Sequence, residues 1–189
     1  MIHISIEGMD GVGKSTTCKL LAEKLGYKFV EKPLHYLFDK DEEKFDEYLR
    51  IRDQVNANPN RDFTSWFYGL GSLFMYETFK EDNIVTDRHL ASNYAWSGAD
   101  YNEDVYDLLV KKLGAPKLTV IIYSPSDVIV QRLISRDKND KDIARAKQSE
   151  RIYERMIDFC KKYSFPYVVI DTSRFSPEEV LNRILEELK

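Results

Sequence analysis

Short apolar runs alternate with longer amphipathic segments along the chain. Runs rich in β-branched and aromatic residues predict five strands, at residues 2–6, 27–33, 83–87, 117–124 and 167–171. Apolar positions at helical spacing predict helices over 14–26, 41–80 with a break at 56–60, 89–96, 101–114, 125–136, 153–163 and from 176 onward. Strands that alternate with helices predict an α/β fold, in which helices cover both faces of a parallel sheet.

Two helix ends carry specific signals. Gly26 follows the last apolar position of the first helix and is expected to end it. Ser176, Pro177 and Glu179 suit the cap, the first position and the third position of the last helix.

Parallel sheets of this kind bind their ligands at the carboxyl ends of the strands. We therefore expect the segments that follow the strands to lie along one rim, namely residues 7–15, 31–33, 87–88, 124 and 171–174. Functional side chains are expected in these segments.

Residues 8–15, GMDGVGKS, have the spacing of a phosphate-binding loop between the first strand and the first helix. Its glycines allow a tight turn whose backbone N–H groups face phosphate oxygens, and the helix start adds partial positive charge. Lys14 can bridge the β- and γ-phosphates, and the Ser15 hydroxyl can bind Mg²⁺. The residues expected to hold the nucleotide phosphates are Gly8, Gly11, Val12, Gly13, Lys14, Ser15 and Thr16.

Two carboxylates, Glu7 and Asp10, belong to this region and would repel a triphosphate unless they face Mg²⁺ or a sugar hydroxyl. A third, Asp87, ends an apolar strand and is expected near Ser15, where it could hold Mg²⁺ directly or through water. Arg88 is expected on the opposite side of that strand end, where it could contact a second phosphate or stack on a base. The pattern predicts metal binding by Ser15 and Asp87, and a direct substrate role for Asp10 and Glu7.

Arg132 and Arg136 lie four residues apart, hence on one face of a helix. The almost wholly polar stretch that follows suits a lid of residues 136–148, which closes over the site and excludes water. Arg136 and Arg132 are the best candidates to neutralise charge on a phosphoryl group in transfer, an effect worth about 10³ to 10⁵ in rate. The remaining cations of this stretch are expected to be mostly solvated.

Composition narrows the classes of function. The 189 residues suit a single domain, and the net charge of −4 provides no general basic field, so neither nucleic acid nor membrane is expected as a partner. Cys18 and Cys160 lie far apart and are expected to be reduced thiols. No metal-ligand spacing links His3, His35 and His89. No signal peptide or membrane span is evident, so a cytoplasmic protein is predicted.

Two motifs together resemble the thymidylate kinase family of nucleoside monophosphate kinases. The first, IEGMDGVGKSTT, is similar to the family's E-G-x-D/E-G-x-G-K-[ST]-T, and the second, residues 87–98, is similar to D-R-[YH]-x-x-S-x-x-A-[YW]-x-G. The matching residues of the second segment are Asp87, Arg88, His89, Ser92, Ala95, Trp96 and Gly98. Residues 169–180 are similar to the family's last strand and adenine-side loop, which implies an ATP-side position for Arg174.

The resemblance implies transfer of the γ-phosphoryl group of ATP to a deoxynucleoside monophosphate, most directly dTMP to dTDP, with Mg²⁺. It implies a P-loop NTPase-type three-layer fold with a five-stranded parallel sheet of order 2-3-1-4-5, and a homodimer. The catalytic candidates are then Lys14, Arg136, Arg132, Asp87 and Glu7. The acceptor-binding candidates are Asp10, Lys32, Phe74, Arg88, Asn93 and Trp96.

By position in the family, Asp10 would contact the 3′-hydroxyl of the deoxyribose and Phe74 would stack on thymine. Arg88 would sit near the acceptor phosphate or base. Because Val12 stands where some members carry an arginine, the resemblance directs attention to Arg136 of the lid as the source of that charge.

The chain departs from the family on the acceptor side. Residues 30–36 read VEKPLHY where the family usually has R-E-P-G-G, so Lys32 could replace an arginine's charge but not its bidentate fork. Residues 75–78, MYET, supply no arginine where the family often has one, and Ser97 stands where glutamine is common. The alternative prediction is therefore a deoxynucleoside kinase that phosphorylates a 5′-hydroxyl, with Glu31 or Glu7 as general base. A non-catalytic nucleotide-binding regulator is a more remote alternative.

Overall fold

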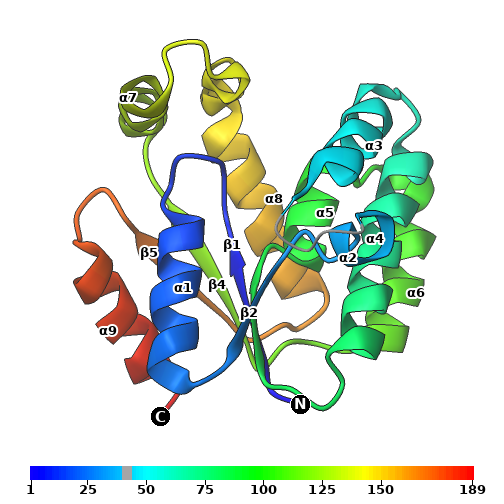
Figure 1. The fold of residues 1–189 in the computed structure, drawn as a ribbon, viewed down its shortest axis with the longest axis horizontal. Coiled ribbons are helices and arrows are strands. Elements are labelled where there is room, and N and C mark those ends of the chain that lie inside the picture. The colour runs from blue at the N-terminus through cyan, green and yellow to red at the C-terminus, as the bar shows by residue number, and fades with distance from the viewer. Residues whose placement is uncertain (40–43) are drawn as a thin grey trace.

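The computed structural model describes residues 1–39 and 44–189. Within these residues, five parallel strands form one sheet in the order β2-β3-β1-β4-β5 (Figure 1). The strands are β1 (His3–Glu7), β2 (Lys28–Glu31), β3 (Ile84–Asp87), β4 (Leu118–Tyr123) and β5 (Tyr167–Asp171). The predicted strands and the strand order implied by the family resemblance are both confirmed.

Helices cover both faces of the sheet, as predicted. The α-helices are α1 (Lys14–Leu25), α2 (His35–Phe38), α3 (Asp46–Ala57), α4 (Arg61–Thr78), α5 (Leu90–Ser97), α6 (Glu103–Leu113), α7 (Ser126–Arg136), α8 (Ser149–Lys162) and α9 (Pro177–Glu187). Helices α1 and α9 pack together on one face, and α5 packs with α8 on the other, with α4 beside α5 and α6 beside α4 (Figure 1). In the described part of the chain, none of the helices has both the length and the apolar character that crossing a bilayer requires.

The central strand β1 and its neighbour β4 are almost wholly buried, which explains their continuous apolar runs. Every residue of β1 is buried, and Ile4 and Ile6 belong to the same core cluster as Val120 and Ile121 of β4. Burying an aliphatic side chain of this size stabilises the fold by about 1.5–3 kcal/mol. This core fixes the ends of the strands, on which the site is built.

The predicted helix ends are confirmed. Gly26 ends α1 in the left-handed conformation, with φ of 67°. At the start of α9, the Ser176 hydroxyl accepts from the Glu179 N–H at 3.3 Å, and the Glu179 carboxylate accepts from the Ser176 N–H at 2.8 Å. Pro177 occupies the first turn of this helix, so the capping pattern read from the sequence forms as expected.

Boundaries between β2 and α4 differ in part from the prediction. Strand β2 ends at Glu31, because Lys32 adopts a left-handed φ of 46° and turns the chain. Helix α2, which the sequence reasoning did not predict, follows this turn. The predicted break at 56–60 is confirmed, since the Asn60 side chain accepts backbone N–H groups in the first turn of α4. The predicted helix start at 41 lies outside the described residues, and α3 begins at Asp46.

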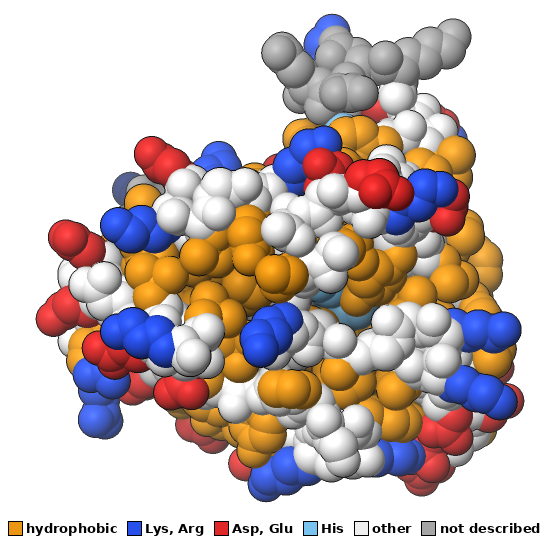
Figure 2. Space-filling model, turned by 90° about the horizontal axis from the view of Figure 1, so that it is seen from below, with side chains coloured by type: hydrophobic (Ala, Val, Ile, Leu, Met, Phe, Trp, Pro, Cys, Tyr) orange, Lys and Arg blue, Asp and Glu red, His pale blue; other side chains and the backbone are white. Residues whose placement is uncertain are grey.

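The carboxyl ends of the strands form one rim. The pairing register places Glu31 opposite Asp87 and Tyr123 opposite Asp171, so the segments that follow these strands lie at the same edge, as predicted. Helix α7 and the segment that follows it extend beyond this edge, while both termini lie at the other end of the molecule (Figure 1). That opposite end presents acidic and basic side chains interspersed with apolar ones (Figure 2).

Candidate active site

The loop between β1 and α1 requires glycine at two positions. Gly8 has φ of 152°, and a Cβ there would lie 2.5 Å from the carbonyl oxygen of Ile122. Gly13 adopts a left-handed φ of 98° at the N-cap of α1. A side chain at Gly8 or Gly13 would therefore strain the turn. The loop wraps around the N-terminus of α1, where unpaired N–H groups and partial positive charge favour a phosphate.

Lys14 lies across the mouth of this loop. Its side chain is 5% exposed, and Nζ donates to the Met9 carbonyl oxygen at 2.7 Å and lies 3.5 Å from Asp10 Oδ1. Burial and then the positive charge of Arg88 lower the pKa of this ammonium, whereas the charges of Asp10 and Asp87 raise it. The ammonium is thus held by oxygen acceptors that phosphate oxygens can replace.

Ser15 and Asp87 meet as the sequence predicted. The Ser15 hydroxyl donates to Asp87 Oδ2 at 2.9 Å, and both Ser15 and its neighbour Thr16 are exposed in the first turn of α1. Mg²⁺ prefers oxygen ligands, keeps several waters and accepts phosphate oxygens, so this pair of donors fits it. Across residues 1–39 and 44–189, no three His, Cys, Asp or Glu side chains are grouped to hold a metal ion by themselves.

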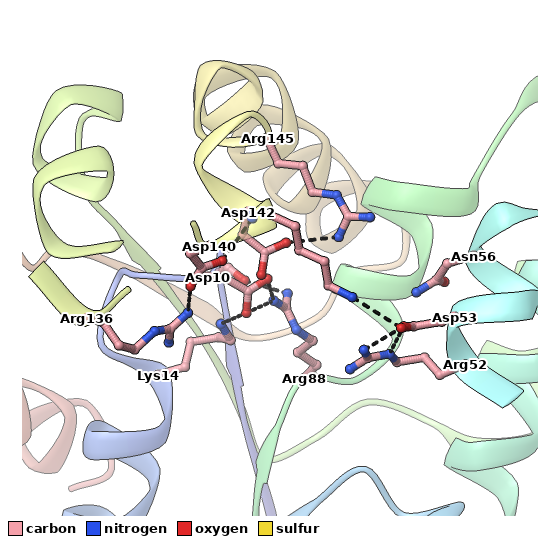
Figure 3. A network of polar contacts seen from close by, with 12 residues as sticks. Asp10, Lys14, Arg52, Asp53, Asn56, Arg88, Arg136, Asp140, Asp142 and Arg145 are labelled. Atoms are coloured by element: carbon pink, nitrogen blue, oxygen red, sulfur yellow. Dashed lines mark hydrogen bonds and ion pairs between the residues drawn. The ribbon is translucent and has the colours of Figure 1, made fainter. Parts of the chain in front are cut away.

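Arg88 turns from the end of β3 toward the loop and binds Asp10 (Figure 3). Its Nη1 donates to the Gly8 carbonyl oxygen at 2.6 Å, and its Nη2 donates to both Asp10 carboxylate oxygens at 2.9 Å. Burial disfavours the charge of Asp10, but Arg88 and Lys14 outweigh it and hold the pKa of Asp10 well below its usual range. Arg88 also has a left-handed φ of 78°, a strained conformation that is often retained at functional sites.

Glu7 lies beneath the loop. Its side chain is fully buried, and Oε2 accepts the backbone N–H groups of His89 at 3.2 Å and Ser92 at 3.1 Å. Burial raises the pKa of this carboxyl, while hydrogen bonds from Ser92 and His89 and the charge of Arg88 oppose the rise. Glu7 therefore joins the end of β1 to the start of α5, and this geometry favours a positioning role over direct contact with substrate.

The two arginines of α7 have different surroundings. Arg132 donates to Ser124 Oγ at 3.1 Å and to the Thr172 carbonyl oxygen at 2.8 Å, which ties α7 to the ends of β4 and β5. Arg136 is 62% exposed and pairs with Asp140 in the segment after α7. Arg136 can therefore turn toward a bound phosphate, whereas Arg132 is fixed in the scaffold.

Polar and aromatic residues expected on the acceptor side come from several elements. Lys32 pairs with Glu31 at 2.9 Å and lies 4.8 Å from the centroid of the Phe45 ring. The guanidinium of Arg145 lies 6.0 Å from the centroid of the Trp96 ring, so the predicted lid contacts α5. Lys32 therefore contacts the residue that precedes α3, whereas Trp96 contacts the lid.

Three further expected site residues differ in exposure. Asn93 is buried; its Nδ2 donates to the Ser65 carbonyl oxygen at 3.1 Å, and its Oδ1 accepts from the Tyr106 hydroxyl at 3.2 Å, which favours a packing role. Phe74 is half-buried on α4. Arg174 is exposed after β5, where its Nε lies 3.2 Å from an Asp171 carboxylate oxygen.

Two residues that the sequence analysis did not name individually support the site, although one of them, Thr172, lies in the predicted rim segment 171–174. Thr172 donates from Oγ1 to the Val12 carbonyl oxygen at 2.8 Å, so the end of β5 holds the phosphate loop. Arg155 of α8 donates to the carbonyl oxygens of Ala95 at 3.0 Å and Gly98 at 2.5 Å, and thereby satisfies the end of α5. No local pattern signals these contacts, because the partners lie 57 to 160 residues away along the chain.

The phosphate loop lies at the head of a parallel sheet of order 2-3-1-4-5, with the Ser15–Asp87 pair beside it and with Arg136 and Arg145 paired to carboxylates of the lid. This arrangement is that of a P-loop nucleotide kinase. Residues 6–184 match the family described as Thymidylate kinase, so the chain belongs to the thymidylate kinase family. It is an enzyme of the nucleotide kinase class, with ATP as phosphoryl donor and small-molecule nucleotides as substrates.

Similar proteins carry several substrate names. The chain is 29% identical to a "Putative adenylate kinase" of Thermococcus gammatolerans, over 97% of this chain and 83% of that protein. It is also 29% identical to a "Probable thymidylate kinase" of Methanocaldococcus jannaschii, over 100% of this chain and 96% of that protein. A solved structure of deoxyadenosine kinase from M. mycoides superposes with a TM-score of 0.66 at 18% identity, covering 99% of this chain and 98% of that one. The last comparison supports the fold.

Proposed function

We propose that the protein transfers the γ-phosphoryl group of ATP to a deoxynucleoside monophosphate, most directly converting dTMP to dTDP. The observation that carries this proposal is a pair of polar contacts on two sides of Lys14, Ser15 with Asp87 and Asp10 with Arg88. The first contact suits a triphosphate with its metal ion, and the second suits the sugar and phosphate of an acceptor. Membership of the thymidylate kinase family supports the same reaction.

In the proposed reaction, an ionised oxygen of the acceptor phosphate attacks the γ-phosphorus of ATP. The bond from that phosphorus to the β,γ-bridging oxygen breaks, and ADP leaves with the bonding electrons. The attacking oxygen needs no strong base, because it is already ionised. The loop N–H groups and Lys14 hold the phosphates in line with the acceptor, and Arg136 turns from Asp140 to balance charge on the group in transfer. Mg²⁺, which Ser15 and Asp87 would hold, neutralises charge on the phosphate oxygens when bound.

We further propose that residues 1–189 form one nucleotide kinase domain with a lid at 136–148. The lid contains 3₁₀ turns at Lys141–Ile143 and Ala146–Gln148. Its Lys141 lies 3.2 Å from Asp53 of α3, so the lid and α3 are joined by an ion pair (Figure 3). Closure of this segment over bound nucleotides would exclude water from the phosphoryl group.

A homodimer and a cytoplasmic location complete the proposal. Exposed apolar side chains follow one face of α4 at helical spacing, namely Phe63, Trp66, Leu70 and Leu73. A continuous apolar stripe of this kind is typical of an interaction surface, and we assign it to a second copy of the chain. Cys18 and Cys160 are both buried and free, which agrees with a reducing compartment.

A deoxynucleoside kinase is the second candidate function. It is favoured by the lack of an arginine in residues 30–36 and by the position of Glu31 at the end of β2, where it pairs with Lys32. This carboxylate could serve as a general base for a nucleoside 5′-hydroxyl. The two candidates differ in whether the acceptor already carries a phosphate.

The test is turnover of matched acceptors with ATP and Mg²⁺. Thymidine and dTMP form the central pair, beside the corresponding nucleosides and monophosphates of cytosine and adenine. We expect turnover of monophosphates, fastest with dTMP, and a loss of about 10²- to 10³-fold or more in kcat for Lys14→Ala. Turnover of the nucleosides alone would instead support the second candidate.

A further inference from the structure

A monophosphate acceptor needs a cation that the rest of the site has not already engaged. Its phosphate carries about two negative charges and must come close to a triphosphate of the same sign. In the sequence, residues 30–36 and 75–78 contain no arginine. The basic residue of the first segment, Lys32, already pairs with Glu31 at 2.9 Å, so we expect another cation to meet the acceptor phosphate.

Arg88 is poorly suited to do this alone. Its Nη1 is used by the Gly8 carbonyl oxygen, and its Nη2 is shared between both oxygens of Asp10. Burial disfavours the charged form of Arg88 and acts to lower its pKa. The negative charges of Asp10, Asp87 and Glu7 outweigh this effect, so the pKa of Arg88 is raised. Arg88 is therefore already neutralised by acidic residues of the chain.

Arg52 on α3 has unused donors beside the same space. Its side chain is 25% exposed, and only Nε and Nη2 donate, both to Asp53 Oδ1, at 3.0 and 2.6 Å. In residues 1–39 and 44–189, its Nη1 makes no hydrogen bond. An arginine held along one edge leaves the other edge for two parallel bonds to a phosphate.

Arg52 and Arg88 border a common space between α3, α4 and the strand ends. Burial raises the pKa of the Tyr48 phenol, and the positive charges of Arg52 and Arg88 oppose that rise. Burial also raises the pKa of Tyr68, where a hydrogen bond to Asn56 and three arginine charges oppose it. These arginines are Arg52, Arg88 and Arg145. Figure 3 shows Arg52, Arg88 and Arg145 extending toward one region from α3, from the end of β3 and from the lid.

We propose that Arg52 is the receptor for the phosphate group of the nucleoside monophosphate acceptor. The inference rests on the proposed function and identifies the residue that makes a monophosphate, in preference to a nucleoside, the acceptor. Asp53 accepts from Arg52 with one oxygen and from Lys141 of the lid with the other, at 3.2 Å. An acceptor bound to Arg52 therefore lies next to the ion pair that joins the lid to α3.

The experiment compares Arg52→Gln and Arg52→Lys with the matched control Arg50→Gln. Arg50 lies on the same helix, is 56% exposed and pairs with Glu47. We expect Arg52→Gln to raise the KM for dTMP about 10- to 100-fold, because a hydrogen-bonded charge partner is lost. The KM for ATP should stay unchanged, Arg52→Lys should show an intermediate KM for dTMP, and Arg50→Gln should match the wild type.

A second measurement separates phosphate recognition from a structural effect. Thymidine and dTMP are titrated against each protein, and the ratio of their dissociation constants is compared. Arg52→Gln should lower the preference for dTMP by the same factor as its change in KM, with thymidine binding unchanged. Equal weakening of both ligands, or an unchanged KM for dTMP in an enzyme that uses monophosphates, would overturn the inference and leave the proposed function standing. Wild-type turnover of nucleosides alone would overturn both.

Discussion

At the scale of single residues, burial separates the roles of the two carboxylates near the phosphate loop. Asp10 lies at the mouth of the loop, where Arg88 and Lys14 keep it ionised. Glu7 lies below the loop, where it accepts two backbone N–H groups at the start of α5. The sequence places both beside a nucleotide, but only the packing around them distinguishes a residue that can face substrate from one that holds the scaffold.

Substitution of Glu7 tests this distinction. Glu7→Ala leaves two buried N–H groups without an acceptor and should reduce the free energy of unfolding by about 1–3 kcal/mol. Glu7→Gln keeps an oxygen acceptor and the volume, and it should remain folded. Because burial raises the folded-state pKa of Glu7 above 4.5, its stabilising contribution is complete below that pH and is lost as the pH rises through the folded-state pKa.

The free energy of unfolding of Glu7→Gln should therefore increase relative to the wild type as the pH rises above 4.5. Urea unfolding at several pH values measures this difference. A difference that does not change with pH would contradict the assignment of a raised pKa to Glu7.

At the scale of elements, the arginines of α7 and of the lid fall into two groups. One is held by the ends of the strands, and the other pairs with carboxylates of the lid itself. Arg132 is tied to Ser124 and Thr172, and thereby fixes α7 against the strand ends. Arg136 extends from the end of the same helix to a lid carboxylate, and Arg145 pairs with Asp142 within the lid. A rigid helix thus presents a lid whose charges can be rearranged around a nucleotide.

Arg136→Gln should lower kcat by about 10³-fold or more if its guanidinium balances charge in the transition state. The matched control is Lys138→Gln, since Lys138 is an exposed cation of the same segment and should leave kcat near the wild-type value. Steady-state kinetics with saturating ATP and dTMP gives both values. Equal losses of kcat in the two variants would contradict this role of Arg136 and would indicate that the net charge of the lid determines kcat.

Much of this architecture follows from short-range sequence signals. Gly26, Ser176 and Asn60 set helix ends through contacts with near neighbours, and the phosphate loop is encoded by adjacent residues. Helix α2 escaped prediction because it is a single short turn set by the left-handed Lys32. The roles of Arg155 and Arg52 escaped it as well. Each depends on elements brought together by the fold, which a single sequence does not display.

At the scale of the whole molecule, the apolar stripe of α4 is the feature that the fold of one chain leaves unexplained. Trp66, at its centre, is 45% exposed. Trp66→Glu should weaken self-association by about 2 kcal/mol or more, because a tryptophan that becomes buried in an interface is a common hot spot of binding. Light scattering after size exclusion measures the mass, with Ile134→Glu on α7 as the control. A monomeric wild-type protein would refute the proposed dimer.

The stability of the whole molecule should also depend on pH through two buried histidines. The rings of His3 and His89 lie 4.8 Å apart, and His3 hydrogen-bonds Tyr76 at 2.7 Å and Thr86 at 2.9 Å. Burial lowers the pKa of His89 to about 3, and burial followed by the charge of His89 lowers the pKa of His3 well below 6.5. Both rings are therefore neutral in the folded protein where the unfolded chain binds protons.

Their stabilising effect is complete above pH 6.5 and is lost as the pH falls toward the two folded-state pKa values, of which that of His89 is about 3, by up to about 1.4 kcal/mol per pH unit for each histidine. Urea unfolding between pH 7.5 and pH 5, read in steps of about half a unit, measures the slope. His89→Asn should reduce it by about half. A wild-type free energy of unfolding that is constant over this range would contradict the buried neutral state.

The ion pairs of the rim have a consequence for selectivity among anions. Lys14 has Asp10 and Arg136 has Asp140 as internal counter-ions, so the proposed nucleotide binding would exchange one set of anions for another. A lone inorganic anion can displace only one such carboxylate and gains little over it. A polyphosphate anchored in the loop displaces several at once, and the gain from each adds to the next. The carboxylates of the chain should therefore lower the affinity of the site for small anions more than its affinity for polyphosphates.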